Sequence, residues 1–366
     1  MKEITIPQSN KSIGGDEVFI IAEIGKNFIQ TQEEKTVSEY LDNAKKLVDA
    51  AVDAGCDAVK FQTHIVLDEQ ANIDIVSPHF KGSDRYSWVA RNTNITPREG
   101  FWEPLKEYCD QKGIIFFSTP MSRGAAQKVD DLVSLWKVGS GDVQDYILMD
   151  YISDTGKPII ISTGMVSIDE LHKILEDYKS ARSPFIVLYC ISKYPCPKEE
   201  FNLATIQYLA EKYPNTPIGF SDHSIGDEAA LVAVKVGARV IEKHFSFSRE
   251  LWGSDHKVSM TPREMKEMVL KIRNGHFKDI DETPYLGEDT KEFEGATNQF
   301  RPYFNKTLVA GKDIKKGEVL TKEMIFAMRP KMYLDGTPSD RVKDIVGKKV
   351  TKDIKQYEPI KNEHLE

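Results

Sequence analysis

The chain has 366 residues, a formal net charge of −8 at pH 7 and 40% hydrophobic residues. This composition excludes a disordered, collagen-like or coiled-coil protein, and the length predicts one large domain with a small appendage. The acidic balance argues against nucleic acid as a partner, because nucleic-acid binding needs a basic face. No apolar run is long enough to predict a membrane-spanning helix, and the start MKEITIPQSNKS lacks the apolar region of a signal peptide. We therefore expect a cytoplasmic protein with no membrane partner.

Short β-rich apolar runs recur through the first 245 residues and alternate with helical patterns. There are eight such runs: Val18–Gly25, Ala58–Gln62, Gly113–Thr119, Leu135–Ser140, Pro158–Thr163, Phe185–Ile191, Pro217–Ser221 and Ala238–Phe245. Eight βα units over about 250 residues predict an α/β fold of the (β/α)₈ TIM-barrel type. An open doubly wound sheet uses the same alternation. The first run, however, is followed by Gly25-Lys26-Asn27-Phe28 and not by the Gly-x-Gly-x-x-Gly turn of a dinucleotide-binding fold.

The connection from Thr63 to about Thr96 is too long for a plain loop and has few helical signals. Long connections at a barrel mouth often act as lids or substrate walls. We expect this segment to form one wall of a binding site.

The C-terminal part of the chain differs from the barrel in charge and in pattern. Residues 301–366 carry 15 Lys and Arg against 10 Asp and Glu. The segments Asp313–Ile325 and Asp353–Leu365 form an imperfect repeat that predicts a small β-rich module of pseudo-twofold character. We predict a catalytic barrel over residues 1–280, a linker over 281–304 and this module over 305–366.

Polar residues stand at the C-terminal end of every predicted strand, which is the face where TIM barrels carry their chemistry. They are Glu23, Lys60, Gln62, Ser118, Thr119, Lys137, Ser140, Ser162, Thr163, Ser192, Ser221, His223, Glu242 and His244. A single Ser or Thr there can simply cap the next helix. Polar groups at the same end of eight buried strands instead predict a shared ligand, and the lysines and hydroxyls predict that this ligand is anionic.

His223 follows the seventh predicted strand and His244 lies near the end of the eighth, each close to a carboxylate in sequence. Two imidazoles at neighbouring strand ends are typical of a divalent metal site with positions left open for water or substrate. A rival chemistry is a Schiff-base aldolase, in which Lys60, Lys137 or Lys243 would form an imine without a metal. A third alternative is a non-catalytic binding protein, which the intact set of polar strand ends disfavours.

Several segments resemble the sialic acid synthase family, whose members are phosphoenolpyruvate-dependent nonulosonate synthases. The resemblance is carried by Ile20–Gly25, Val59–Thr63, Phe117–Pro120, Lys137–Gly141, Pro158–Met165, Gly219–Ser224 and Glu242–Phe245, and by Thr307–Pro330, which is similar to the family's antifreeze-like SAF domain. It implies a TIM barrel that condenses phosphoenolpyruvate and water with an N-acetylated amino hexose, giving a nine-carbon 2-keto acid and phosphate. It also implies Mn²⁺, or else Mg²⁺ or Co²⁺, as the cofactor.

The resemblance further implies a role for each matching residue. His223 and His244 would be the metal ligands, and Glu23 the acid or base near the reacting carbons. The phosphoenolpyruvate shell would be Lys60, Thr119, Lys137, Ser140, Ser162, Ser192 and Ser221. Gln62 and Asp255 would lie on the sugar side. Arg329 would reach the sugar in the partner subunit's site, which implies a domain-swapped homodimer.

Several residues depart from the family pattern, so the sequence allows more than one acceptor sugar. Phe28 stands where many members have His, Asp142 where many have Glu, and Lys331 follows Arg329-Pro330 where glycine is usual. The acceptor is therefore either N-acetylmannosamine or a 6-deoxy diacetamido sugar that leads to a legionaminic or pseudaminic acid. The runner-up activity is a related phosphoenolpyruvate-dependent 3-deoxy-keto acid synthase, which the SAF-like segment disfavours.

Overall fold

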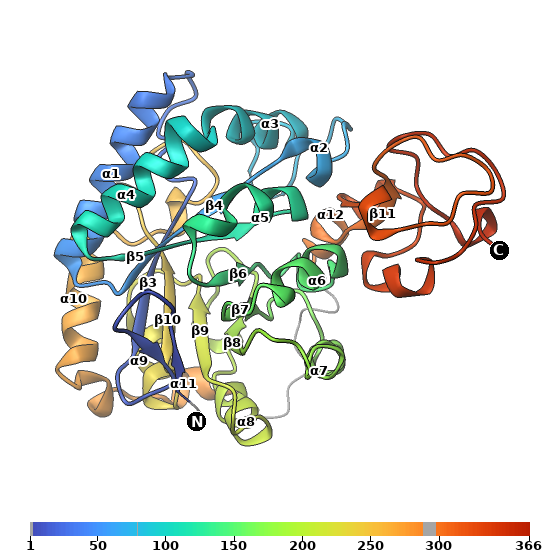
Figure 1. Ribbon diagram of the computed structural model, residues 1–366. Helices are drawn as coiled ribbons and strands as arrows, with labels where there is room; N and C mark the ends of the chain where they lie inside the picture. The colour runs from blue at the N-terminus through green and yellow to red at the C-terminus, as the bar shows by residue number, and fades with distance from the viewer. Residues whose placement is uncertain (1–2, 79, 288–297) are drawn as a thin grey trace.

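Eight parallel strands close into a barrel in the computed structural model, which describes residues 3–78, 80–287 and 298–366 (Figure 1). The strands are β3 (Phe19–Gly25), β4 (Ala58–Thr63), β5 (Ile115–Pro120), β6 (Trp136–Val138), β7 (Ile159–Ser162), β8 (Phe185–Cys190), β9 (Ile218–Asp222) and β10 (Val240–His244). Each neighbour pair is parallel, and β10 closes the barrel by pairing with β3, so that His244 lies opposite Glu23. Each of the eight predicted runs coincides with one strand, and the barrel prediction is confirmed.

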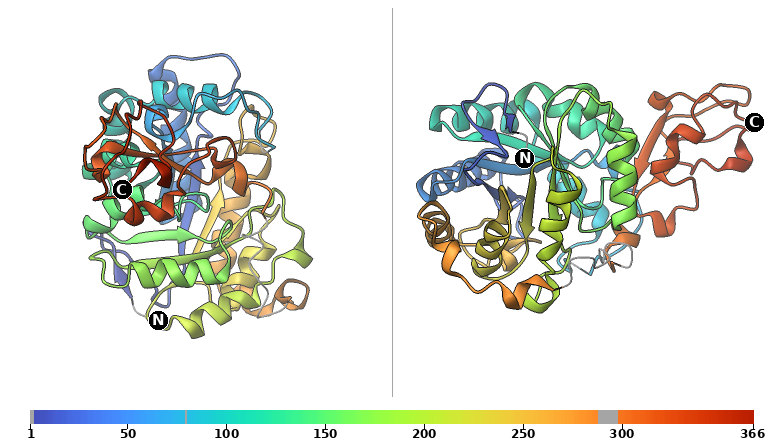
Figure 2. Two further views of the ribbon diagram at one scale, coloured as in Figure 1. Left: turned by 90° about the vertical axis from the view of Figure 1, so that its right-hand side faces the viewer. Right: turned by 90° about the horizontal axis from the view of Figure 1, so that it is seen from below.

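Helices follow the strands and surround the barrel (Figure 2). They are α1 (Val37–Ala54), α4 (Glu103–Lys112), α5 (Arg123–Val129), α6 (Tyr146–Asp154), α7 (Ile168–Asp177), α8 (Ala204–Lys212), α9 (Glu228–Lys235) and α10 (Pro262–Arg273). Helix α1 shows how the sequence sets these boundaries, because Thr36 and Glu39 form a capping box at its start. Gly55 ends it at φ +83°, a left-handed conformation that glycine adopts without strain.

The prediction of few helical signals between Thr63 and Thr96 was wrong in part. The segment contains α2 (Val66–Glu69) and the eleven-residue α3 (Arg85–Ile95). Asp84 caps α3 by accepting a hydrogen bond from the backbone N–H of Ser87 at 2.8 Å. The apolar residues of α3 show only a weak helical periodicity. This helix contributes Arg85 and Trp88 to the cavity at the barrel mouth, so it does not need one continuous apolar face. A short hairpin of β1 (Ile4–Thr5) and β2 (Ser12–Ile13), which the sequence did not predict, precedes the barrel.

The last sixty residues form a separate lobe beside the barrel, coloured red in Figure 1. Its antiparallel pair β11 (Thr307–Ala310) and β12 (Ile325–Met328) is joined by short turns. The two repeat segments contact each other reciprocally: Asp353 accepts from the backbone N–H of Lys316, and Asp313 from that of Gln356, both at 2.9 Å. The pseudo-twofold character expected from the repeat is therefore present in the structure.

The C-terminal lobe packs on the barrel through polar contacts near α5 and α6. Arg123 donates to the backbone oxygens of Lys322 and Ile325, at 2.8 and 3.2 Å. Ser339 donates to the carbonyl of Gln144 at 2.9 Å. Part of the predicted linker contains the short helices α11 (Thr283–Leu286) and α12 (Arg301–Phe304), while residues 288–297 of it lie outside the described residues. Among the described residues, no helix combines the length and apolar character needed to cross a membrane.

Candidate active site

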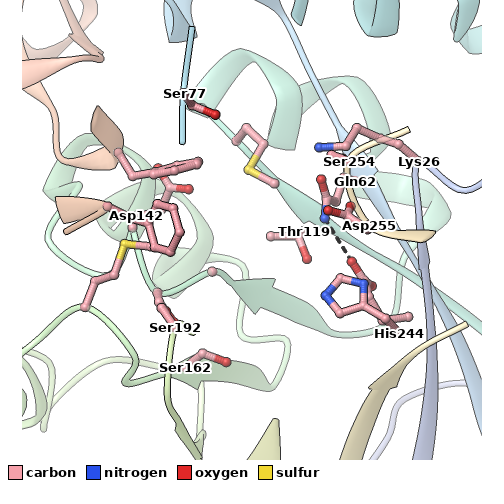
Figure 3. Close-up of a pocket in the computed structure, with 18 of the residues that line it drawn as sticks. Lys26, Gln62, Ser77, Thr119, Asp142, Ser162, Ser192, His244, Ser254 and Asp255 are labelled. Carbon is pink, nitrogen blue, oxygen red and sulfur yellow. Dashed lines mark hydrogen bonds between the residues drawn. The ribbon is translucent and has the colours of Figure 1, made fainter. Parts of the chain in front are cut away.

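All the site residues predicted from the sequence line one cavity at the C-terminal ends of the strands (Figure 3). They are Glu23, Lys60, Gln62, Thr119, Lys137, Ser140, Ser162, Ser192, Ser221, His223, His244, Asp255 and Arg329. The parallel topology causes this convergence, because it brings the carboxyl ends of all eight strands to one face. The shared ligand site expected from the polar strand ends therefore exists as a single cavity. Ser118 and Thr163 are exceptions, because neither lines it, and Ser118 Oγ is instead hydrogen-bonded to Thr63 Oγ1 at 2.6 Å.

Two buried lysines flank one carboxylate in the floor of the cavity. Lys60 Nζ lies 3.6 Å and Lys137 Nζ lies 3.8 Å from the Glu242 carboxylate. Lys60 also donates to Thr119 Oγ1 at 2.9 Å, and Lys137 donates to Ser162 Oγ at 2.6 Å. Ser221 donates to Glu242 at 2.9 Å. Both lysines line the cavity, so a bound anion can meet both ammonium groups.

The buried charges of Glu242, Lys137 and Lys60 shift one another's pKa values. Burial alone would raise the pKa of Glu242, but Lys137 and Lys60 outweigh it and hold that pKa at about 2. Burial lowers the pKa of Lys137, and the nearby Lys60 lowers it further. Burial would also lower the pKa of Lys60, but Glu23 and Glu242 keep it above the usual range. Glu242 is thus a fixed anion that offsets part of the positive charge of the two lysines.

Ser140 and Ser192 form a second polar part of the cavity, and the backbone of Gly164 lies close to both side chains. Ser140 Oγ accepts a hydrogen bond from the backbone N–H of Gly164 at 3.0 Å. A side chain at position 164 would collide with Ser192 Oγ and would come within 2.9 Å of Ser140 Oγ, so glycine is required there. Ser192 Oγ is buried and has no hydrogen-bond partner in the described part of the chain. These donors are placed to hold an oxygen-rich ligand.

His223 and His244 face each other, with their ring centroids 5.5 Å apart. His223 Nδ1 donates to the carbonyl of Ile191 at 2.8 Å, which leaves the Nε2 lone pair available as a ligand atom. Tyr194 packs on His223 with a centroid distance of 4.2 Å. No group of three or more His, Cys, Asp or Glu residues in the described ranges is arranged to hold a metal. The two imidazoles fit a metal site completed by substrate or water, and they do not form a closed structural site.

Glu23, Gln62 and Asp255 converge around Gly25 on another side of the cavity. Gln62 Nε2 donates to Glu23 Oε1 at 2.9 Å, and Lys60 Nζ lies 2.7 Å from Glu23 Oε2. A Cβ at Gly25, whose φ is +54°, would lie within 3.6 Å of a polar side-chain atom of each of the three. Burial, assisted by the charge of Glu242, raises the pKa of Glu23 despite the neighbouring Lys60. A carboxyl group with a raised pKa is suited to carry a proton during a reaction.

Arg329 enters the cavity from the C-terminal lobe of the same chain. Its side chain is 2% exposed and forms an ion pair with Asp142, which also lies 2.9 Å from Lys306 Nζ. The backbone of Arg329 bonds to the α2 region, donating to the carbonyl of Glu69 and accepting from the N–H of Ala71, both at 2.9 Å. The expectation that this residue enters the partner subunit's site concerns a second chain and stays a prediction.

Several cavity residues were missed or left unassigned by the sequence analysis. Glu242 was recognised only as a polar strand end, although its central place between the lysines makes it part of the site. Cys190 is a buried free thiol that also lines the cavity, with its Sγ 3.9 Å from His223 Nδ1. Other lining residues that were not assigned to the site include Lys26, His64, Glu69, Arg85, Tyr194, Phe300 and Phe304. Most of them lie in loops, where no periodic pattern marks their direction.

Comparison with known proteins identifies the family. The sequence model of the NeuB family matches residues 47–279, and that of the SAF domain matches residues 305–366. The chain is 33% identical to the pseudaminic acid synthase of Campylobacter jejuni, over 94% of this chain and 95% of that protein. It is 29% identical to the N-acetylneuraminate-9-phosphate synthase of Homo sapiens, over 96% of this chain and 94% of that protein.

A solved structure supports the same assignment over the whole chain. The spore coat polysaccharide biosynthesis protein SpsE from Bacillus subtilis superposes with a TM-score of 0.78 at 29% identity, covering 100% of this chain and 99% of that one. The barrel and the C-terminal lobe are thus both shared with this relative. The chain belongs to the NeuB family and ends in a SAF domain.

Proposed function

We propose that this protein is a nonulosonic acid synthase, which condenses phosphoenolpyruvate and water with an N-acetylated amino hexose to give a nine-carbon 2-keto acid and phosphate. The names of its relatives support the class of reaction, since they include pseudaminic acid and N-acetylneuraminate-9-phosphate synthases. Those names refer to different sugars. The family therefore supports the class of product, and the identity of the acceptor sugar has to be inferred from this chain's own residues.

The observation that carries the proposal is the pair of buried lysines in the cavity floor. Lys60 and Lys137 lie 3.6 and 3.8 Å from the carboxylate of Glu242, and each also meets a hydroxyl. Buried cations surrounded by hydroxyl and amide donors are the groups that hold a carboxylate and a phosphate on one small molecule. Phosphoenolpyruvate carries both groups within a few bonds of each other.

We further propose a divalent metal, Mn²⁺ or alternatively Mg²⁺ or Co²⁺, at His223 and His244. The free Nε2 of His223 and the facing imidazole of His244 support this, because imidazole suits first-row transition metals. Such an ion would polarise the acceptor aldehyde as a Lewis acid when bound.

The remaining chemistry can be assigned to residues of the chain. Lys60 and Lys137 would hold the donor so that its C3 faces the acceptor aldehyde, and a carbon–carbon bond forms between C3 and C1 of the sugar. The aldehyde oxygen takes up a proton, and C2 of the donor becomes electrophilic. Water adds at C2, and the bond between C2 and the bridging oxygen breaks, releasing phosphate. Glu23, with its raised pKa, lies beside Lys60 and is placed to move the proton.

Gln62, Asp255 and Arg329 would bind the acceptor sugar. In the homodimer that the family resemblance implies, we propose that the SAF domains are exchanged, so that Arg329 serves the partner subunit's barrel. The contacts that dock the lobe on its barrel, such as the pairing of Arg329 with Asp142, would be the same in either arrangement.

The proposal is tested by measuring phosphate release from phosphoenolpyruvate with a panel of amino hexoses, together with the mass of the product. We expect phosphate and a nine-carbon 2-keto acid in equal amounts, and loss of both in His223→Ala. Pyruvate as the product, or no reaction with any acceptor in the panel, would contradict the proposal.

A Schiff-base aldolase is the second candidate, and the lowered pKa of Lys137 favours it, because an imine forms from a neutral amine. Lys243 is not suited to that role, since it is fully buried in an ion pair with Asp222 at 2.7 Å and does not line the cavity. Treatment with borohydride in the presence of pyruvate separates the two candidates. An aldolase would gain a covalent adduct on lysine, and the proposed synthase would not.

A further inference from the structure

One buried lysine connects the two strand ends that carry His223 and His244. Lys243 stands between Glu242 and His244 in β10, and both of these neighbours line the cavity whereas Lys243 does not. Because side chains alternate between the two faces of a strand, the Lys243 side chain lies on the outer face of the barrel. It is completely buried there. Its position excludes Lys243 from the chemistry in the cavity and leaves its role to be explained.

The ammonium group of Lys243 makes all of its hydrogen bonds within one turn of the chain. Nζ donates to Asp222 Oδ2 at 2.7 Å, to the Ser224 carbonyl at 2.9 Å and to Ser224 Oγ at 3.1 Å. Asp222 Oδ1 also accepts a hydrogen bond from the backbone N–H of Ser224 at 2.7 Å. An ammonium group has three N–H donors, so these bonds use all of them. The two residues that Lys243 binds are the two neighbours of His223 in the chain.

His223 and His244 are held in place by different means. His244 belongs to the strand ladder, because it pairs with Glu23 of β3. The ladder between β9 and β10 ends at the pair of Asp222 and Lys243, so His223 is the first residue beyond it. The backbone of His223 therefore depends on the contacts of its two neighbours for its position.

Stability alone is a weak explanation for the ion pair of Lys243 and Asp222. Taking two charges out of water costs free energy that their mutual attraction only partly returns. Apolar residues of similar volume often stabilise a protein interior as well or better. Charged hydrogen bonds do, however, fix geometry, because each of them sets a direction as well as a distance. The arrangement around Lys243 thus favours a role in fixing the position of the turn.

We propose that Lys243 and Asp222 are positioning residues, which hold His223 opposite His244 so that the two imidazoles can bind one divalent ion. This inference rests on the metal site of the proposed function. The ring centroids of the two histidines lie 5.5 Å apart. The carbonyl of Ile191 orients the His223 ring by accepting from Nδ1, as partners of metal-binding histidines commonly do. Lys243 and Asp222 fix the backbone that carries this ring.

The test measures Mn²⁺ binding to the full chain by calorimetry, and stability by urea unfolding. We expect Lys243→Met to bind Mn²⁺ at least about 10-fold more weakly and to unfold at a lower urea concentration, because Asp222 is left buried and unpaired. The double variant Asp222→Leu/Lys243→Met has no unpaired charge and should regain most of this stability. It should still bind Mn²⁺ at least about 10-fold more weakly, since the turn is no longer held.

Arg273→Met is the matched control. Arg273 pairs with Asp57 at 2.7 Å, and neither residue lines the cavity. This variant also loses an ion pair to a buried carboxylate, so it should be less stable than the wild type. Its dissociation constant for Mn²⁺ should change by less than about 2-fold, because the turn at His223 is intact.

The outcomes separate positioning from stability. Recovery of both stability and Mn²⁺ affinity in the double variant would show that the ion pair is only structural, and would overturn the proposal. Unchanged affinity in both variants, or an equal loss of affinity in Arg273→Met, would overturn it as well. Should Lys243→Met not fold, the double variant alone decides.

A separate measurement distinguishes failure of this inference from failure of the metal site. If the wild type binds no Mn²⁺, or if His223→Ala binds it equally well, the proposed metal site is wrong. Positioning is then decided by NMR of the metal-free protein, in which the His223 Nδ1 proton bonds to the Ile191 carbonyl. This proton should exchange with water at least about 10-fold faster in the double variant than in the wild type. Equal exchange rates would overturn the positioning role.

Discussion

Arg329 and Asp142, 187 residues apart in the chain, form a buried ion pair that ties the SAF domain to the mouth of the barrel. Lys306 adds a second cation on the same carboxylate at 2.9 Å. The lobe therefore contributes a charged group to the wall of the cavity and is more than an attached module. This relationship makes both substrate binding and stability depend on the docking of the two domains.

Replacing Arg329 should affect the acceptor much more than the donor. We expect Arg329→Gln to raise the KM for the acceptor sugar by about 10-fold or more, because a charged hydrogen bond is lost on that side of the cavity. The KM for phosphoenolpyruvate should change by less than about 2-fold, since the proposed donor site lies at Lys60 and Lys137. Steady-state kinetics with each substrate varied in turn measures both values. Equal effects on the two KM values would remove Arg329 from the acceptor site.

Mixing an inactive variant with an impaired one, at an acceptor concentration well below the KM of the impaired variant, tests the exchange of SAF domains. An Arg329→Ala chain keeps an intact barrel, and a His223→Ala chain keeps an intact SAF domain. In an exchanged dimer, half of the dimers formed by refolding the mixture are hybrids with one complete site, so about a quarter of the wild-type activity should return. If each SAF domain serves its own barrel, no complete site forms and the mixture keeps only the residual activity of its Arg329→Ala chains.

The two lysines of the cavity floor should control the donor. We expect Lys137→Met to lower kcat/KM for phosphoenolpyruvate by about 100-fold, because it removes a cation and leaves Glu242 to repel the donor. Lys157→Met is a matched control, since Lys157 pairs with Asp130 outside the cavity. Wild-type kinetics in Lys137→Met would exclude this residue from the donor site.

Stability should depend on pH through Asp142. Burial alone would raise the pKa of Asp142, but Arg329 and Lys306 outweigh it and hold that pKa below its usual range. A lowered folded-state pKa stabilises the fold above the unfolded-state pKa of about 4, and this contribution is lost as the pH falls through the folded-state value.

The variant Asp142→Asn should therefore be less stable at pH 7, by about 3 kcal/mol, because it leaves two buried cations uncompensated. Its free energy of unfolding should fall less than that of the wild type between pH 7 and pH 3. Urea titrations at several pH values measure this difference. Parallel pH profiles for the two proteins would show that the ion pair has no role in stability.

Removal of divalent ions should abolish phosphate release without unfolding the protein. The two imidazoles of His223 and His244 are held by the strand ends and by the carbonyl of Ile191, so the fold does not need the ion. Chelation should leave the circular dichroism spectrum unchanged, and Mn²⁺ should restore activity. Full activity in metal-free protein would refute the metal site.

The parts of the molecule that follow from periodic patterns could be predicted from the sequence. Lys60, Lys137 and His244 lie close together because the C-terminal ends of parallel strands are on the same face of the barrel. The alternation of strands and helices along the sequence predicts this parallel arrangement. The pairing of Arg329 with Asp142 could not be predicted, because it depends on how two domains dock. Lys26 and Arg85 were missed for a related reason. They lie in connections, whose path is set by tertiary packing and not by local pattern.

The most direct test of the account is the fate of the bridging oxygen of phosphoenolpyruvate. Phosphoenolpyruvate labelled with ¹⁸O on the oxygen that bridges C2 and phosphorus is incubated with the protein, Mn²⁺ and the N-acetylated amino hexose that it accepts, and the products are analysed by mass spectrometry. If water adds at C2 and the bond between carbon and oxygen breaks, the label appears in the released phosphate, beside an unlabelled nine-carbon 2-keto acid. Label retained in the keto acid, or in pyruvate, would contradict the proposed condensation.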